Sequence, residues 1–260
     1  MSPIIQTSSN NAKEDTDPGL IKRTAVLVYG LTAYHIGVTG LMWIILAMGG
    51  LAPIGFSPLQ AESSVVAMMI NLGLITLFGL QHSIMARGWF KQWLETWLPK
   101  SAERSTYVML SGVFMSIAIY FWQPVTGIIW SVDNSIGQIV LWAAYAAGWS
   151  YLFIATFVTN HFELMGLRQV YLYFKGESYS PLPFTRKYMY RYSRHPMMLG
   201  VLVGIWALPV MTVSHFIMSS LLTLYIIIGV TLEERDLAQQ FGETYKAYKK
   251  EIAALIPNWV

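Results

Sequence analysis

Two clusters of polar residues flank the last apolar stretch of the chain, and their side chains are of types that bind charged ligands. The first cluster, Arg194-His195-Pro196, stands directly before that stretch. Proline suits the first turn of a helix because it has no N–H to lose there. Arg194 and His195 are therefore expected at a helix N-terminus, whose partial positive charge favours anions. A membrane anchor, with the arginine among the lipid headgroups, explains this cluster equally well.

The second cluster follows the apolar stretch and begins with two adjacent carboxylates, Glu233 and Glu234. Carboxylates at a membrane boundary are costly unless they are paired or meet a ligand. If the helix continues, spacings of four and three place further side chains, mostly aromatic, on one face with Glu234: Ala238, Phe241, Tyr245 and Tyr248. Simple pairing with neighbouring basic side chains in water is the alternative, and it explains one glutamate better than two.

Long apolar runs must position both clusters. Of the 260 residues, 55% are hydrophobic and only 12% are charged, whereas soluble domains carry about 25% charged residues. A transmembrane helix needs about 20 apolar residues, and the qualifying runs are 24–48, 64–85, 105–123 and 136–158. The region 197–230 is interrupted by Pro209 and is interpreted as two helices in a tight hairpin, the first of them short for a full span. The sequence predicts an all-α polytopic membrane protein with five to six transmembrane helices.

The lysines and arginines predict how these helices are oriented. All 17 lie before the first span, at 86–104, at 159–195 or after the last span, while the loops at 49–63 and 124–135 hold none. The positive-inside rule then places both termini and the two basic loops in the cytoplasm. The net charge of +3 is small, and its distribution indicates membrane topology rather than nucleic-acid binding.

The chain is expected to hold one domain. Residues 1–23 are predicted to be a mobile cytoplasmic tail, and 24–260 a single transmembrane domain with a cytoplasmic cap formed by 159–195 and 231–260. The absence of cysteine excludes disulfides, thiolate nucleophiles and thiolate metal ligands. No metal site is predicted, because the histidines are not at paired helical spacings.

The two clusters together resemble a known signature. Arg194-His-Pro-x-x-x-Gly200, a hairpin, and then Glu233-Glu-x-x-Leu-x-x-x-Phe-Gly-x-x-Tyr-x-x-Tyr248 is similar to the C-terminal part of the isoprenylcysteine carboxyl methyltransferase superfamily. The resemblance implies a pocket for S-adenosylmethionine, with S-adenosylhomocysteine as product, at the cytoplasmic membrane face within about 160–257. This cofactor combines a sulfonium, an ammonium and a carboxylate, so carboxylates, an arginine or helix N-terminus, and aromatic walls suit it. The implied cofactor-binding residues are Gln169, Tyr190, Arg194, His195, Pro196, Leu199, Gly200, Glu233, Glu234, Tyr245 and Tyr248.

Three further segments narrow the resemblance to the nurim-like branch of that superfamily. They are Gln81–Arg87, Glu103–Tyr107 and Asn160–Gln169, and the whole pattern over about 24–257 is most similar to the bacterial methanethiol S-methyltransferase family. The resemblance implies conversion of methanethiol, a small-molecule thiol, to dimethyl sulfide by a protein of the bacterial inner membrane, whose partner is the lipid bilayer. No oligomer is predicted.

Thiol methylation suggests candidates for the chemistry. In-line displacement needs a thiolate in an aligned approach, and a histidine base or a nearby arginine favours that thiolate. The catalytic candidates are His82 first and His161 second, with Arg168 as electrostatic partner, and the substrate candidates are Gln81, Asn160 and Glu163. Each of them is alternatively an interfacial hydrogen-bonding residue.

Other functions are compatible with the same pattern. A lipid amine or an isoprenylated cysteine carboxylate as acceptor would require a lipid-facing groove. A sterol-reductase-like enzyme shares a related C-terminal cofactor region, but the chain is short for one. A non-catalytic nurim-like membrane protein would be indicated by loss of the Arg-His-Pro or Glu-Glu element, and both are present.

Overall fold

The computed structural model describes residues 19–182 and 186–256. Of the predicted tail, residues 1–18 lie outside the described residues, and 19–23 belong to the first turns of helix α1 (Gly19–Met48). Lys22 and Arg23 therefore stand on the first transmembrane helix rather than before it.

Five helices in the described part of the chain are long and apolar enough to cross a membrane. They are α1, α2 (Ser64–Met85), α4 (Glu103–Phe121, preceded by the 3-10 turn η1, Lys100–Ala102), α5 (Ser135–Thr159) and α9 (Val213–Phe241). Lipid offers no hydrogen bonds to the backbone, so long apolar runs close their own bonds as helices. The prediction of a polytopic all-α membrane protein is confirmed.

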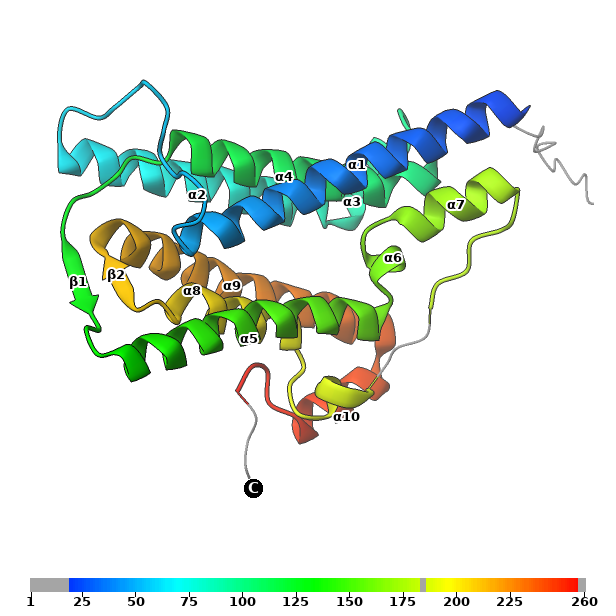
Figure 1. Cartoon of the computed structure of the whole chain (residues 1–260). Helices are drawn as coiled ribbons and strands as arrows, with labels where there is room; N and C mark the ends of the chain where they lie inside the picture. The colour runs from blue at the N-terminus through cyan, green and yellow to red at the C-terminus, as the bar shows by residue number, and fades with distance from the viewer. Residues whose placement is uncertain (1–18, 183–185, 257–260) are drawn as a thin grey trace, which may run out of the picture.

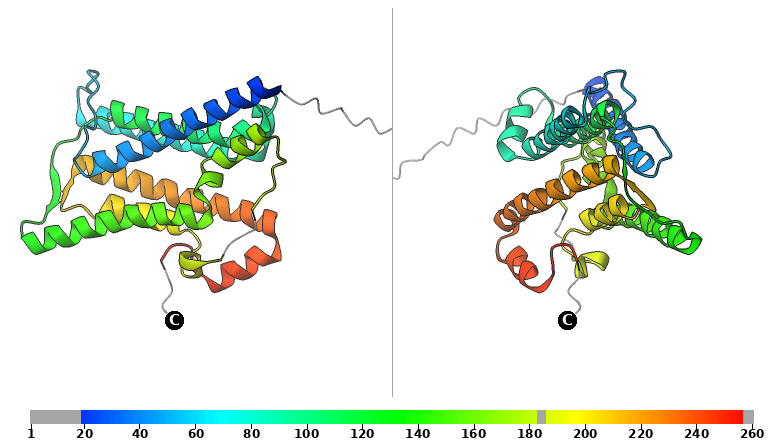
Figure 2. Two further views of the ribbon diagram at one scale, coloured as in Figure 1. Left: turned by 45° about the vertical axis from the view of Figure 1, so that its right-hand side comes forward. Right: turned by 90° about the vertical axis from the view of Figure 1, so that its left-hand side faces the viewer.

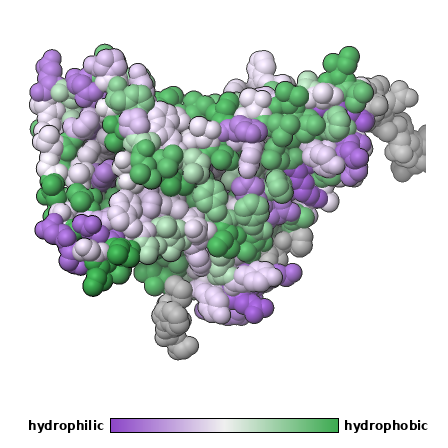
Figure 3. Space-filling view, viewed as in Figure 1, coloured by the Kyte–Doolittle hydropathy of each residue, from purple (hydrophilic) through white to green (hydrophobic). Residues whose placement is uncertain are grey.

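Large apolar side chains project outward from these helices. Ile136 is 77% exposed and Leu72 is 53% exposed, an arrangement that suits contact with lipid rather than water. Figure 3 shows hydrophobic side chains over much of one face of the molecule, with hydrophilic ones densest near its margins. The exposed apolar surface is thus the lipid-facing surface of a membrane protein.

The helices form two groups that face each other (Figures 1 and 2). In the first group α4 packs against both α1 and α2, and in the second α5 packs along α8 (Pro196–Trp206) while α9 contacts α8 and α2. The polar residues predicted to do chemistry are therefore shared between two helix groups.

The predicted hairpin of two helices needs a correction. Its first arm, α8, has only 11 residues, about 16 Å, or roughly half of the apolar thickness of a membrane. Pro209 lacks an N–H and disfavours helix in the residue before it, so the chain continues in extended form. Strand β2 (Val210–Thr212) pairs antiparallel with β1 (Ile128–Ser131) at the far end. The segment between α8 and α9 is therefore extended, where the prediction had the helix continue.

Helices α5 and α8 approach closely because glycines face each other. A Cβ on Gly148 would lie 2.6 Å from the Gly204 nitrogen, and one on Gly200 would lie 2.7 Å from the nitrogen of Leu152. Since Gly200 packs at the level of Leu152, α8 begins about one turn inside the end of α5 at Thr159. His195 and Arg194 directly precede α8 and therefore lie inside the bundle, about one helical turn from its end.

A hydrophobic core fills the end of the bundle that carries the two strands. Its buried residues come from both helix groups and include Ile44, Met48, Ile119, Tyr145, Leu208 and Met211. Trp122 donates its indole N–H to the Ser214 hydroxyl at 2.8 Å, which joins the end of α4 to the start of α9. This end of the molecule is sealed.

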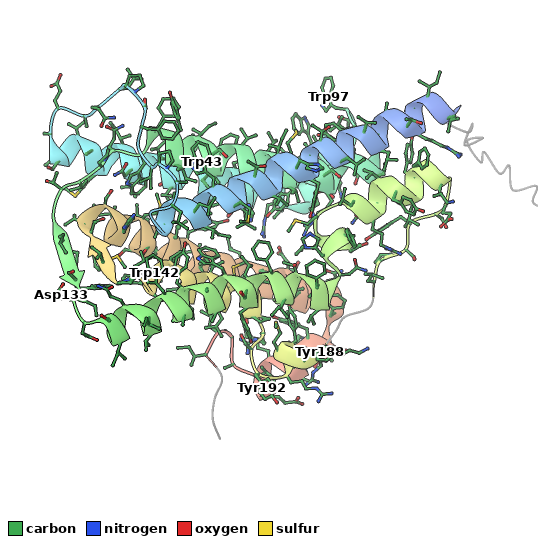
Figure 4. All side chains as sticks on the ribbon, in the orientation of Figure 1. Trp43, Trp97, Asp133, Trp142, Tyr188 and Tyr192 are labelled. Atoms are coloured by element: carbon green, nitrogen blue, oxygen red, sulfur yellow. The ribbon has the colours of Figure 1, made fainter. Side chains whose placement is uncertain are left out.

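The opposite end carries the short helices α3 (Gly88–Leu94), α6 (His161–Leu164), α7 (Leu167–Lys175) and α10 (Glu243–Glu251), with the 3-10 turn η2 (Tyr188–Arg191). The described lysines and arginines belong to elements gathered there. In Figure 4 Tyr188 and Tyr192 lie beside α10, and both side chains are exposed. The polar and basic part of the molecule is concentrated at this end.

Candidate functional site

A buried ion cluster joins the residue before α8 to α9 and α10. The Arg194 guanidinium donates to Glu234 Oε1 from Nε at 2.7 Å and from Nη2 at 2.5 Å. Lys249 Nζ lies 2.6 Å from Glu234 Oε2, and His195 Nε2 lies 3.3 Å from Oε1. The remaining guanidinium nitrogen of Arg194, Nη1, donates to the backbone carbonyls of Lys249 and Ile252. Cations on both oxygens offset the cost of burying this carboxylate.

The segment after α10 docks on the residues that precede α8. The backbone N–H groups of Arg194 and His195 donate to the carbonyls of Ala253 and Ala254, each at 3.0 Å, and the Ser193 hydroxyl also donates to Ala254. The sequence predicts that the positive N-terminus of α8 favours an anion. These two N–H groups instead hold the C-terminal segment in place.

Glu233 lies in a different environment from its neighbour. Its side chain is 48% exposed, whereas that of Glu234 is 8% exposed, and its Oε2 lies 3.4 Å from His195 Nδ1. The Glu233 carboxylate also interacts electrostatically with His82 and Tyr107 of the first helix group. Of the two adjacent glutamates, Glu234 closes an ion cluster and Glu233 stays open between the helix groups.

The helix does not continue from Glu234 to the tyrosines as supposed. It ends at Phe241, and Gly242 adopts a φ of +55°, in the region that favours glycine. Because α10 turns back at this point, Tyr245 and Tyr248 are buried beside the ion cluster instead of extending along α9.

The three candidate tyrosines lie together in neutral form. The Tyr248 hydroxyl donates to the Tyr190 carbonyl at 2.5 Å, and the rings of Tyr245 and Tyr248 are 5.9 Å apart. Burial raises the pKa of Tyr248 to about 12 and also raises the pKa of Tyr190 and Tyr245. The negative charge of Glu233 adds to the increase in the pKa of Tyr190 and Tyr245, so all three remain hydrogen-bond donors at physiological pH.

His82 occupies a hydrogen-bond network between α2 and α4. Its Nε2 lies 2.6 Å from the Tyr107 hydroxyl, and its Nδ1 lies 2.9 Å from the Ser111 hydroxyl. The Arg104 guanidinium stands 5.2 Å from the centre of the Tyr107 ring, and the Tyr225 ring of α9 meets the imidazole edge-on at 6.2 Å. The first catalytic candidate therefore lies where α2, α4 and α9 meet.

His161 occupies a second network, between α1 and α5. Its Nε2 lies 3.0 Å from the Tyr34 hydroxyl and its Nδ1 lies 2.9 Å from the Thr156 hydroxyl. The ring stacks on Phe157 at 4.6 Å and is buried, and burial lowers its pKa. The structure thus gives the second catalytic candidate the contacts of a bridge between two helices.

The remaining candidates of the 160–169 segment gather around Glu163. Arg168 Nη1 lies 2.8 Å from Glu163 Oε2, and the Tyr179 hydroxyl donates to the other oxygen. Asn160 caps α6 by accepting the Glu163 N–H at 3.1 Å, and Gln169 donates to the Glu163 carbonyl at 3.1 Å. Burial and the bond to Glu163 raise the pKa of Tyr179 to about 12. Asn160, Arg168 and Gln169 thus converge on Glu163.

A cleft of about 660 Å³ opens at this end of the molecule. One wall comes from α3, η1 and the start of α4, and the other from the end of α5 with α6 and α7. Arg104, Glu163 and Gln169 line it. Because Arg104 also covers Tyr107, the cleft borders the His82 network.

The other predicted residues have structural contacts. Gln81 donates to the Met85 sulfur at 3.0 Å. Pro196 starts α8, Leu199 donates its N–H to the His195 carbonyl, and Gly200 packs against α5. The predicted residues therefore fall into three groups, around Glu234, His82 and Glu163, with His161 and Gln81 outside them.

Tyr107, Arg104 and Lys249 complete these groups and had no predicted role. Arg104 and Tyr107 lie at the start of α4, at the same end of the bundle as His82, and the shared basic end was the available signal. Lys249 reaches Glu234 only because α10 turns back at Gly242, which no sequence pattern indicated.

The chain is similar to known methyltransferases. The phospholipid methyltransferase family matches residues 142–244. Methanethiol S-methyltransferase of Crocosphaera subtropica is 41% identical over 91% of this chain and 93% of that protein. The protein of the same name from Mycobacterium tuberculosis is 37% identical over 91% of this chain and 98% of that protein. Bovine nurim is more distant, at 28% identity over 69% of this chain and 71% of nurim. No solved structure matches.

The matches cover both helix groups and the segments that carry the Arg194–Glu234 cluster and the His82 network. They confirm the resemblance drawn from the sequence, and the five long apolar helices supply the membrane setting. The chain therefore belongs to the methanethiol S-methyltransferase family, carries a phospholipid methyltransferase domain over residues 142–244, and is an integral-membrane methyltransferase.

Proposed function

We propose that this protein transfers a methyl group from S-adenosylmethionine to methanethiol, giving dimethyl sulfide and S-adenosylhomocysteine. The names of its relatives support a thiol acceptor. We also propose that the working end faces the cytoplasm of a bacterial inner membrane, because the lysines and arginines gather at that end. Both termini would then be cytoplasmic.

The observation that carries the proposal is the position of Glu233. Its half-exposed carboxylate lies 3.4 Å from His195 in the second helix group, and its negative charge acts on His82 and Tyr107 in the first. A cation held by this carboxylate would have tyrosine rings nearby, an arrangement that favours sulfonium and ammonium groups. An acceptor bound beside His82 would then lie next to the donor.

The residues of this site fit S-adenosylmethionine. When bound, the cofactor supplies an electrophilic methyl group on a sulfonium. Glu233 would meet a cationic part of it, and Tyr190 would border the same space. Arg194 and Lys249 both bind the Glu234 carboxylate, so we assign these three residues to positioning His195 rather than to contact with the cofactor.

A lipid acceptor receives less support. The apolar groove of about 520 Å³ is lined by α1 and by Val113, Ser116, Ile117 and Tyr120 of α4. At 100° per residue these positions point away from the face of α4 that carries Tyr107 and Ser111. A long chain lying in this groove would therefore be separated from His82 by α4 itself, whereas a small thiol needs no such groove.

The test is methyl transfer by the purified protein in detergent, with dimethyl sulfide measured by headspace gas chromatography. Glu233→Gln should lose most of the product, and the matched control Glu243→Gln, on an exposed carboxylate paired with Lys246, should keep it. Phosphatidylethanolamine and an isoprenylated cysteine serve as competing acceptors. Product from either of them but none from methanethiol would replace the proposed acceptor. Tight binding of neither S-adenosylmethionine nor S-adenosylhomocysteine would end the proposal.

A further inference from the structure

The hydrogen bonds around His82 fix the direction in which each proton points. The Ser111 hydroxyl donates to the Tyr107 backbone carbonyl at 2.8 Å, so its single proton is already used. Ser111 can therefore only accept from His82, and Nδ1 of the neutral ring carries the proton. The other ring nitrogen, Nε2, is then an acceptor, and the Tyr107 hydroxyl donates to it at 2.6 Å.

Both nitrogens of His82 are thus occupied, which matters for any proton transfer. A thiol could reach the imidazole directly only by displacing Tyr107 or Ser111. The Tyr107 oxygen, in contrast, has donated its proton and retains lone pairs that accept. The acceptor that this network offers to a thiol is therefore the Tyr107 oxygen, which is hydrogen-bonded to His82 Nε2.

Two charged groups act on Tyr107. Arg104 stands over the Tyr107 ring and lines the cleft at the basic end. Glu233 acts electrostatically on Tyr107 and on His82, and it is the carboxylate assigned above to the cationic donor. The Tyr225 ring of α9 packs against the imidazole of His82. Of the polar groups in this network, Tyr107 is thus the one in contact with Arg104, which lines the cleft.

We propose that Tyr107 is a catalytic residue that takes the proton of the thiol and passes its own to His82. This inference rests on the proposed function. In the step the S–H bond breaks and its proton bonds to the Tyr107 oxygen, while the former hydroxyl proton bonds to Nε2 of His82. The sulfur electron pair forms the new S–CH3 bond, and the old carbon–sulfonium bond breaks with its electrons going to the S-adenosylhomocysteine sulfur.

The positive charge is conserved in this step, since one sulfonium is lost and one imidazolium is formed. The negative charge of Glu233, which acts electrostatically on His82, favours the imidazolium. Ser111 is a positioning residue, because it accepts from Nδ1 and holds the tautomer in which Nε2 can receive a proton. The imidazolium releases its proton to water after the methyl transfer.

The His161 network supplies a matched comparison. Thr156 donates to the Phe153 carbonyl at 2.7 Å, so His161 Nδ1 donates to Thr156 and its Nε2 accepts from Tyr34. The order of tyrosine, histidine and hydroxyl is the same, but this ring is enclosed by Phe157 and Phe162. Tyr34→Phe therefore removes the same hydroxyl at a place where no thiol is expected.

The experiment compares thiols of similar size and different acidity. Ethanethiol must lose a proton, whereas 2,2,2-trifluoroethanethiol is largely ionised slightly above neutral pH. Loss of a general base typically costs about 10²–10⁴-fold in rate, so Tyr107→Phe should lower kcat/KM for ethanethiol at least about 10²-fold. For the acidic thiol the loss should be less than about tenfold. Raising the pH with methanethiol should likewise restore the variant.

The outcomes separate this inference from the proposed function. Equal losses on both thiols, with no recovery at high pH, would overturn the relay while dimethyl sulfide formation by the wild type leaves the proposed function standing. The same thiol-dependent pattern in Tyr34→Phe would also overturn it. A wild type that methylates no thiol would remove both proposals together. Recovery confined to Tyr107→Phe supports the relay, and unchanged S-adenosylhomocysteine binding by this variant shows that it is folded.

Discussion

The buried cluster around Glu234 makes a quantitative prediction about stability. Replacing Arg194 by methionine removes both bonds to Glu234 Oε1 and leaves the carboxylate with Lys249, whose side chain is half exposed. Breaking a buried ion pair on one side costs about 3–5 kcal/mol, because a charge stays buried without its partner. Lys249→Met removes the half-exposed cation, and such pairs contribute about 0–1 kcal/mol.

Thermal unfolding in detergent, followed by the fluorescence of the 10 tryptophans, measures the difference. At about 2–4 °C per kcal/mol for a chain of this size, Arg194→Met should lower Tm by roughly 6–20 °C. Lys249→Met should lower it by at most about 4 °C. The double variant Arg194→Met/Glu234→Leu should recover much of the loss, since replacing a whole buried pair by apolar side chains is often close to neutral.

Two results would refute this reasoning. Equal shifts for Arg194→Met and Lys249→Met would mean that burial does not distinguish the two cations. A double variant less stable than Arg194→Met would mean that Glu234 contributes through contacts other than this pair.

Further predictions concern the cofactor, the helix packing and pH. Glu233→Gln should weaken S-adenosylhomocysteine binding at least about tenfold by calorimetry, about 1.4 kcal/mol, and unchanged affinity would remove Glu233 from the cofactor site. Gly148→Val should lower Tm because its side chain collides with α8, whereas Gly73→Val, at a position with open space, should not. Burial lowers the pKa of His161 below its ordinary 6.5, so its contribution to stability is present above pH 6.5 and is lost as the pH falls through the lowered value. His161→Gln should therefore flatten the fall of Tm between pH 7 and 5, and an unchanged slope would contradict this.

The long helices could be predicted because lipid leaves a 20-residue apolar run with few alternatives. The helix α2 begins and ends where the apolar run 64–85 does, and α5 differs from 136–158 by one residue at each end. The sequence pattern predicts less well how a short apolar run such as that of α8 ends. The extended segment after α8 depends on the pairing of β2 with β1, a contact between residues about 80 positions apart.

The site was predictable in its residue types and not in their roles. Glu233 and Glu234 are identical in sequence terms, and only the side of α9 on which each lies makes one buried and the other open. The two histidines chosen as bases share the same kind of hydrogen-bond partners, and only their neighbours distinguish them. The turn at Gly242 brings Lys249 to Glu234, and a single positive φ gives no pattern in a sequence.

The sealed end of the bundle has a mechanical consequence. The β1–β2 pair, the Trp122–Ser214 bond and the apolar core fasten the two helix groups together at that end. At the opposite end the groups are joined by polar contacts, Arg87 with Asp236 at 2.8 Å and Tyr34 with His161 at 3.0 Å. Polar contacts can be exchanged for contacts with water, whereas separating the apolar core would expose hydrophobic surface. Any relative movement of the two groups is therefore expected at the polar end, where His82 and Glu233 lie.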